Sequence, residues 1–221
     1  MILYIKTTLY ASMFGKKKNL DWAYLAKYEN ENNQIINRSK NEKKIVFFGD
    51  SIIAGWETHN LLFFKDKKLI NRGINGQTTS QMLIRFRPDV IELNPEAVII
   101  LAGTNDIAGN TGHTTLETIL GNLISMCELA KVNNIKPILS SILPASDYPW
   151  QKGLNPAEKI EKLNGMILQY ANVNDILYVD YYSVMVNRQK GLQSIYSEDG
   201  VHPNKNGYHI MTSILQSTLK L

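Results

Sequence analysis

Cysteine is almost absent from this sequence: Cys127 is the only one, so no internal disulfide can form. It lies in an apolar helical pattern, where a cysteine is usually a small buried hydrophobe rather than a nucleophile. Also absent is an apolar run of about 20 residues, the length that a transmembrane helix needs. No internal repeat, low-complexity segment or linker rich in proline and glycine divides the 221 residues. We therefore expect one stable domain without stable membrane insertion.

Strong charge imbalance and histidine clusters are lacking too. The formal net charge is +4, and the lysines at 16–18, 43–44 and 67–68 form no dense basic stripe with interleaved aromatic residues. We interpret them as solvated surface and expect no nucleic-acid partner. His59, His113 and His209 show no ligand spacing among themselves, whereas metal sites usually need three or four ligands. The sequence therefore predicts no metal site and no cofactor.

The N-terminal stretch lacks the features of a secretory signal. Such a signal has a basic start and an unbroken apolar core. Here no basic residue precedes the apolar part, and residues 6–8 interrupt it. We favour a cytoplasmic location, with a periplasmic or secreted one as the alternative. Asp21 is a candidate N-cap for a helix that runs onward from Trp22. We expect residues 1–42 to form a leader and a helix packing on the domain, and residues 43–221 to form the domain itself.

Short apolar runs alternate with amphipathic stretches along the rest of the chain. Runs that are apolar throughout predict strands covered on both faces, at 45–48, 68–73, 97–102, 137–142 and 176–179. Apolar residues at three- and four-residue steps predict helices at 79–93, 114–132, 156–173 and 203–219, with a kink or restart at Pro88. Helices between the strands give right-handed crossovers and a parallel sheet. The pattern predicts a three-layer α/β/α sandwich with about five parallel strands.

Specific polar residues follow three of the predicted strands. Sites in open parallel sheets lie beyond the carboxyl ends of the strands. The first strand is followed by Gly49-Asp50-Ser51, the second by Gly73, and the third by Gly103-Thr104-Asn105-Asp106. A serine hydroxyl can act as a nucleophile when a base lies beside it. The N–H groups of Ser51 and Gly73 and the side-chain amide of Asn105 would supply the donors that a tetrahedral intermediate needs.

The missing base and its orienting carboxylate are found near the C-terminus. Asp199 and His202 are three residues apart, so one turn can bring the carboxylate to the imidazole. The carboxylate would fix the tautomer and stabilise the imidazolium. We expect Asp50 to tie down the turn before Ser51 through backbone N–H groups, and Asp106 to support the loop that carries Asn105.

Four segments resemble, in order and spacing, the sequence blocks of the SGNH hydrolases, also called GDSL esterases/lipases: 49–51, 73, 103–106 and 199–203. The resemblance spans about residues 43 to 219 and implies a flavodoxin-like α/β/α fold. It implies Ser51 as nucleophile, the N–H groups of Ser51 and Gly73 with the amide of Asn105 as oxyanion donors, and His202 as base with Asp199. Ile52 replaces the leucine of the family name, at a position of apolar packing. The chain looks most like bacterial acylhydrolases of the platelet-activating-factor acetylhydrolase and lysophospholipase/thioesterase branch.

The substrate expected from the sequence is a small-molecule carboxylic ester. No long apolar segment suggests a lipid tunnel, so we favour a short acyl group, acetyl above all, on a small or carbohydrate alcohol. A lysophospholipase or thioesterase is the alternative enzyme, and a catalytically silent carbohydrate-binding protein is the alternative from another class. The segments 107–112 and 143–151 lie at the catalytic edge, either packed on the body or as pocket walls. The sequence leaves the oligomeric state undecided, with a homodimer as one possibility.

Overall fold

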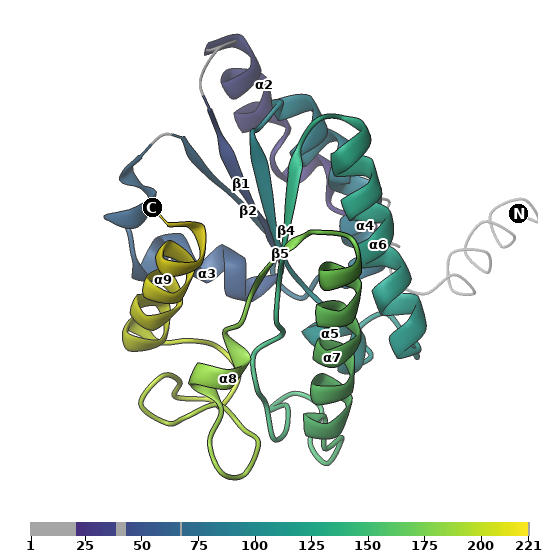
Figure 1. Ribbon diagram of the computed structural model, residues 1–221, viewed down its shortest axis with the longest axis vertical. Coiled ribbons are helices and arrows are strands. Elements are labelled where there is room, and N and C mark those ends of the chain that lie inside the picture. The colour runs from purple at the N-terminus through teal and green to yellow at the C-terminus, as the bar shows by residue number, and fades with distance from the viewer. Residues whose placement is uncertain (1–20, 39–42, 67, 221) are drawn as a thin grey trace, which may run out of the picture.

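The computed structural model describes residues 21–38, 43–66 and 68–220. Its centre is a parallel sheet of five strands in the order β2-β1-β3-β4-β5, with helices on both faces (Figure 1). The predicted three-layer α/β/α class is therefore confirmed. The strands are β1 (Ile45–Gly49), β2 (Leu69–Gly73), β3 (Ala97–Leu101), β4 (Lys136–Ser140) and β5 (Leu177–Val179).

The connecting segments of the described chain contain the helices. The α-helices are α2 (Glu29–Arg38), α3 (Ser51–His59), α4 (Thr79–Asp89), α5 (Thr104–Ile107), α6 (Leu116–Val132), α7 (Ala157–Val173), α8 (Tyr182–Met185) and α9 (Lys205–Leu219). Three short 3₁₀ helices are η1 (Leu25–Lys27), η2 (Phe63–Lys65) and η3 (Ile91–Leu93). None of the described helices is long and apolar enough to span a bilayer.

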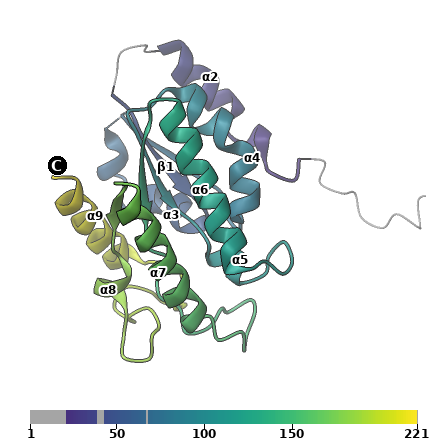
Figure 2. The same cartoon turned by 45° about the vertical axis from the view of Figure 1, so that its right-hand side comes forward.

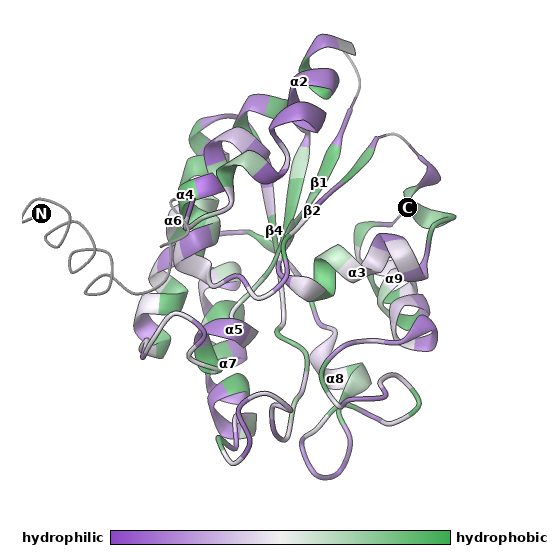
Figure 3. Ribbon diagram, turned by 180° about the vertical axis from the view of Figure 1, so that it is seen from behind, coloured by the Kyte–Doolittle hydropathy of each residue, from purple (hydrophilic) through white to green (hydrophobic). Residues whose placement is uncertain are grey.

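Each face of the sheet has its own apolar core. Alternate strand residues such as Phe48 and Ile100 pack with α4, α6 and α7, which lie side by side in Figure 2. The other strand residues, such as Phe47 and Ile99, pack with α3 and α9. Figure 3 shows the apolar strands in the middle of the molecule and mixed colouring on the surrounding helices. Burial on both faces explains why β1 and β3 are apolar throughout rather than alternating, whereas β2 also carries the buried Asn71 and Arg72.

The register of the strands places three chain segments at one sheet edge. Gly49 at the end of β1 pairs with Gly73 at the end of β2 on one side and with Leu101 at the end of β3 on the other. The residues that follow these three strand ends therefore emerge together. This is the edge at which the polar residues after the strands were expected to meet.

The prediction of one continuous helix from Trp22 was wrong. The Asp21 carboxylate does accept hydrogen bonds from the N–H groups of Leu25 and Ala26. Tyr24, however, has a left-handed backbone (φ 56°, ψ 43°), which breaks the helix before it can form. Only the short η1 follows, and the longer helix α2 begins at Glu29.

The other predicted elements are present with small shifts at their ends. The helix expected over 79–93 divides into α4 and η3, and it does so just after Pro88. The last helix begins at Lys205 rather than at Pro203, because the Asn204 side chain accepts from the N–H of Gly207 and caps it there. The short elements η2, α5 and α8 were not predicted.

The segment before β1 is held against the end of β2. The Tyr28 hydroxyl donates to the carbonyl of Gly73 at 2.5 Å, and the Gln77 amide donates to the carbonyl of Ala23 at 2.8 Å. Asn32 in α2 donates to Asp89 at the end of α4 at 2.8 Å. The leader at 1–20 and the junction at 39–42 lie outside the described residues, so the boundary after residue 42 stays a prediction.

Candidate active site

A serine, a histidine and an aspartate that are distant in sequence form one hydrogen-bonded chain. The Oγ of Ser51 lies 3.0 Å from Nε2 of His202, and Nδ1 of His202 lies 2.7 Å from Oδ2 of Asp199. Since an ionised carboxylate can only accept, the proton of the second bond belongs to Nδ1. That leaves Nε2 free to accept from the serine hydroxyl, the arrangement that a general base requires.

The helices α3 and α9 bring the serine and the histidine together. Ser51 is the first residue of α3, and the Asp50 side chain caps this helix by accepting from the N–H of Ile52 at 2.9 Å. Asp50 thus makes the kind of backbone contact that was expected of it. The hydroxyl of Tyr208 in α9 donates to the carbonyl of Ile52 at 2.8 Å, which fixes the helix that follows His202 against the helix that carries Ser51.

The Asp199 carboxylate is held in its ionised form. Partial burial raises its pKa, but hydrogen bonds from the His202 ring and from the N–H groups of His202 and Val201 outweigh this, so that the pKa falls to about 2. Both backbone bonds go to Oδ1, at 2.8 and 2.9 Å, and leave Oδ2 for the imidazole. The carboxylate is therefore fixed in orientation and charged near neutral pH.

Two of the predicted oxyanion donors, the Gly73 N–H and the Asn105 amide, already have hydrogen-bond partners. The N–H of Gly73 donates to Oδ1 of Asn71 at 2.9 Å. The amide nitrogen of Asn105 donates to the carbonyl of Gln77 at 3.1 Å and to Oδ2 of Asp50 at 3.3 Å. The bond to Asp50 is long and therefore weak. A developing oxyanion can take that hydrogen while the bond to Gln77 remains.

Gly73 has no room for a side chain. A Cβ atom at this position would lie 2.1 Å from the backbone nitrogen of Ala54 and 2.7 Å from the carbonyl carbon of Ile53, both in α3. The helix that carries Ser51 thus packs directly on the backbone at the end of β2. Only glycine permits this approach.

Asp50 is fully buried, and this changes its titration. Burial raises its pKa from 3.8 to about 6, against the lowering effects of the Ile52 N–H and of His202. The folded state therefore binds more protons than the unfolded state between about pH 4 and pH 6. The stability supplied by this group falls as pH rises through that window and is constant above it.

We expect Asp50→Asn to remove this pH dependence. An amide keeps the oxygen that caps α3 but does not ionise. The free energy of unfolding of the wild type should fall, relative to the variant, by about 2 kcal/mol between pH 4 and pH 7. Urea unfolding of both proteins across this range measures the difference. If the unfolding free energies of the two proteins change with pH in the same way, the pKa of the Asp50 carboxyl is the same in the folded and unfolded states.

Asp106 ties two helices of the site together. Its carboxylate accepts from the backbone N–H of Thr79 at 2.9 Å and from the Thr79 hydroxyl at 2.6 Å. Burial raises its pKa, while these bonds from Thr79 lower it. The start of α4 is thereby joined to the short α5, which also carries Asn105.

A cleft of about 830 Å³ opens beside the serine. Ser51, Gly73 and His202 line it, together with polar side chains from the segment before β1, from the end of α3 and from the turn after β2: Tyr24, Lys27, Tyr28, Thr58, His59 and Asn75. His59 stacks on the ring of Tyr208, with 5.3 Å between the ring centroids. The segment before β1 therefore forms one wall of the cleft, a role that its sequence did not indicate.

The segments 107–112 and 143–151 meet at the rim of the site. The Trp150 ring lies 5.9 Å from that of His202, stacks on Tyr148 at 5.1 Å, and donates from its indole N–H to Oδ1 of Asn110 at 3.3 Å. The Asn110 amide donates in turn to Oδ1 of Asn105 at 2.8 Å. These two segments were recognised from their position after strands, but the individual contacts were not predicted.

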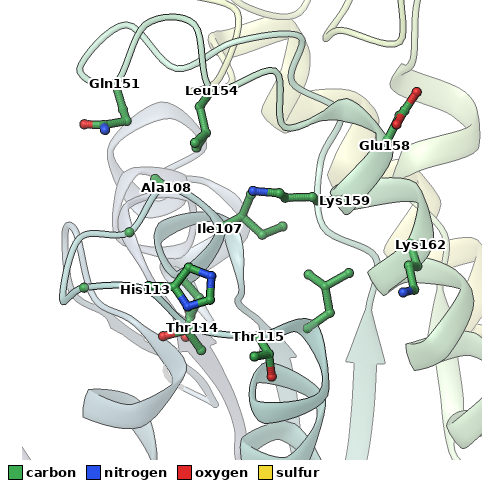
Figure 4. A pocket seen from close by; sticks show the side chains of 14 residues that line it. Ile107, Ala108, His113, Thr114, Thr115, Gln151, Leu154, Glu158, Lys159 and Lys162 are labelled. Atoms are coloured by element: carbon green, nitrogen blue, oxygen red, sulfur yellow. The ribbon is translucent and has the colours of Figure 1, made fainter.

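A second cleft, of about 620 Å³, lies on another side of the 107–112 segment. Figure 4 shows His113 and Lys159 at this cleft on different walls, with Ile107 beside the Lys159 side chain and Leu154 above it. None of Ser51, Asp199 and His202 lines this cleft. Ser51 and His202 line the first cleft instead.

No metal-ligand cluster forms in the described part of the chain. No group of three or more His, Cys, Asp or Glu side chains there has an arrangement that could hold a metal ion. Cys127 is buried within α6. The absence of a metal and of a cofactor stays a prediction.

Comparison with known proteins identifies the family. The pattern of the GDSL-like lipase/acylhydrolase family matches residues 47–210, so the chain belongs to this family of carboxylic ester hydrolases. A GDSL-like lipase from Bacteroides thetaiotaomicron is 46% identical, with a TM-score of 0.86, and the match covers 90% of this chain and 98% of that one. A candidate acylhydrolase from Bacteroides fragilis is 45% identical, with a TM-score of 0.87, covering 93% and 98%. The expected family is confirmed.

A curated relative is longer than this chain. The uncharacterized lipoprotein YqeF of Bacillus subtilis is 32% identical over 117 residues, which are 45% of this chain and 48% of that protein. The match thus spans about half the length of this relative. The likeness to it concerns only the shared part.

Proposed function

We propose that the protein is a serine esterase that hydrolyses carboxylic esters through an acyl intermediate on Ser51. The observation that carries the proposal is the 3.0 Å contact between the Ser51 hydroxyl and Nε2 of His202, with Asp199 on the other ring nitrogen. A hydroxyl becomes an effective nucleophile only beside such a base. The contact joins residues 151 positions apart and lies at the cleft.

In the proposed reaction Ser51 Oγ attacks the ester carbonyl while Nε2 of His202 takes its proton. Asp199 keeps the ring oriented and stabilises the imidazolium that results. The proton then passes from Nε2 to the leaving alcohol, and the C–O bond of the ester breaks. In the second half, water gives a proton to Nε2 and attacks the acyl carbon. The bond from this carbon to Ser51 Oγ then breaks, Oγ takes the proton back from Nε2, and the carboxylic acid leaves. The N–H groups of Ser51 and Gly73 and the Asn105 amide bind the oxyanion in both halves.

Asn105→Ala is expected to lower kcat by on the order of 10²–10³-fold, as for the loss of one oxyanion donor. KM should change little, because the donor acts mainly on the charge that develops in the transition state. Steady-state kinetics on p-nitrophenyl acetate measure both constants, and the melting temperature controls for the loss of a buried side chain. A higher KM with kcat unchanged would assign Asn105 to ground-state binding instead.

We propose a short acyl group, above all acetyl, on a small or carbohydrate alcohol. The cleft beside Ser51 is bordered by side chains with polar atoms, including Tyr24, Lys27, His59 and Asn75. These polar atoms provide hydroxyl-rich alcohols with hydrogen-bond partners, whereas a long acyl chain needs a continuous apolar wall. A lysophospholipase or thioesterase needs such a wall.

Hydrolysis of acetyl, octanoyl and palmitoyl esters of one alcohol tests this specificity. We expect kcat/KM to be highest for acetyl and to fall with chain length. A maximum at octanoyl or palmitoyl would favour the lysophospholipase or thioesterase alternative. Binding of carbohydrate without hydrolysis of any of the three would favour the catalytically silent protein.

We propose the cytoplasm as the compartment. The lipoprotein name of the Bacillus relative favours the periplasmic or secreted alternative. Cell fractionation of the full-length protein separates them.

A further inference from the structure

Asn110 makes three contacts with the residues around the oxyanion site. Its backbone N–H donates to the carbonyl of Asn105 at 3.0 Å, which closes the loop that follows α5. Its side-chain amide nitrogen donates to Oδ1 of Asn105 at 2.8 Å and to the carbonyl of Gly76 at 3.1 Å. The side chain therefore connects α5 with the turn that follows β2.

These contacts act on the group that has to face the substrate. A side-chain amide rotates freely about its last bond unless hydrogen bonds hold it. The Asn105 nitrogen is drawn toward Gln77 and Asp50, and its oxygen is held by Asn110. Donation to the amide oxygen also polarises the amide, which makes its N–H groups better donors. Asn110 thus controls both the orientation and the strength of the donor.

We propose that Asn110 is a positioning residue of this enzyme, an inference that rests on the proposed function. Asn110 holds the Asn105 amide with its NH₂ group toward the carbonyl of an ester substrate bound at Ser51. Asn110 lies outside the sequence blocks that identify the family. It acts through Asn105 and need not touch the substrate.

Trp150 extends this arrangement across the rim. Its indole N–H donates to the one amide atom of Asn110 that is left, Oδ1, at 3.3 Å. Both hydrogens of the Asn110 amide are thereby directed at their two acceptors, because the oxygen faces the indole. The same indole lies 5.9 Å from the His202 ring. The 107–112 and 143–151 segments thus link the oxyanion side of the site with the base.

A double-mutant cycle tests the proposal. Asn110→Ala in the wild type should lower kcat by about 10- to 100-fold with little change in KM, because a donor displaced by a fraction of an ångström loses much of its effect. Asn110→Asp keeps the size of the side chain but removes both donated hydrogens, so it should lose at least as much. In an Asn105→Ala background, Asn110→Ala should lower kcat by less than about twofold, because there is no amide left to position. Asn133→Ala, at the distant end of α6, is the matched control and should leave kcat unchanged.

The outcomes separate this inference from the function on which it rests. Equal losses from Asn110→Ala in both backgrounds, or a loss confined to KM or to the melting temperature, would overturn the positioning role while the wild type remains an esterase. If wild type and Ser51→Ala hydrolyse p-nitrophenyl acetate equally, the proposed function itself fails before the cycle is read.

Discussion

Ser51→Ala is expected to lower kcat on p-nitrophenyl acetate by on the order of 10⁴-fold or more. The change removes the atom that forms the acyl intermediate, and the remaining donors can assist only a direct attack by water. The 3.0 Å contact with His202 and the position of Ser51 at the first residue of α3 are the grounds for this size of effect. Initial rates, corrected for spontaneous hydrolysis, give the ratio.

The fold of this variant should be preserved. Ser51 is partly exposed, and the Asp50 cap of α3 does not involve its hydroxyl. The melting temperature and the far-UV circular dichroism spectrum should therefore match those of the wild type. A correctly folded variant with wild-type activity would remove Ser51 from the mechanism.

Arg85→Leu is expected to lower the free energy of unfolding by about 3–5 kcal/mol. Arg85 is completely buried and pairs with Asp89 at 2.9 Å. It also donates to the carbonyls of Gly49 and Arg72 at 3.0 and 2.9 Å, and to the side chain of Gln77. Its loss leaves a buried carboxylate and several acceptors without their main donor. Urea unfolding with a linear extrapolation measures the change.

Two further variants show whether the unpaired charge is the cause. The double variant Arg85→Leu/Asp89→Leu removes both charges and should recover part of the lost stability. Lys190→Met, which breaks a more exposed pair with Glu161, is the matched control and should cost less than about 1 kcal/mol. Equal effects of Arg85→Leu and Lys190→Met would contradict the importance of the buried network.

This network explains how the body of the fold supports the site. Gly49 is the last residue of β1, directly before Asp50 and Ser51, and the Gln77 carbonyl accepts from the Asn105 amide. Arg85 bonds to both Gly49 and Gln77. A loss of activity in Arg85→Leu would therefore come from displacement of these segments rather than from direct contact with substrate.

The layered fold could be predicted because the information for it is local. Every strand carries a short apolar run, and the helices between them carry apolar residues at helical steps. The segment before β1 could not be predicted in the same way. Helix α2 contains four asparagines, which are poor helix formers, and its contacts with Asp89 and Pro88 come from residues far along the chain.

The residues of the candidate site fall into the same two groups: those that the order of elements predicts and those that depend on contacts between distant residues. Ser51, Gly73 and Asn105 follow strand ends that a parallel sheet must bring to one edge, so their meeting follows from the order of elements. The partners that orient the donors, Asn71 and Asn110, are single polar residues without any periodic signal. Only the three-dimensional packing shows which backbone or amide group each of them contacts.

Labelling with a fluorophosphonate tests the central claim most directly, because this reagent reacts with a serine that a neighbouring base has activated. Peptide mass spectrometry then locates the modified residue. The account predicts one equivalent of label on Ser51 in the wild type, greatly slowed labelling in His202→Asn, and none in Ser51→Ala. Label on another residue, or no label on a folded wild-type protein, would contradict the claim that Ser51 is the nucleophile and His202 its base.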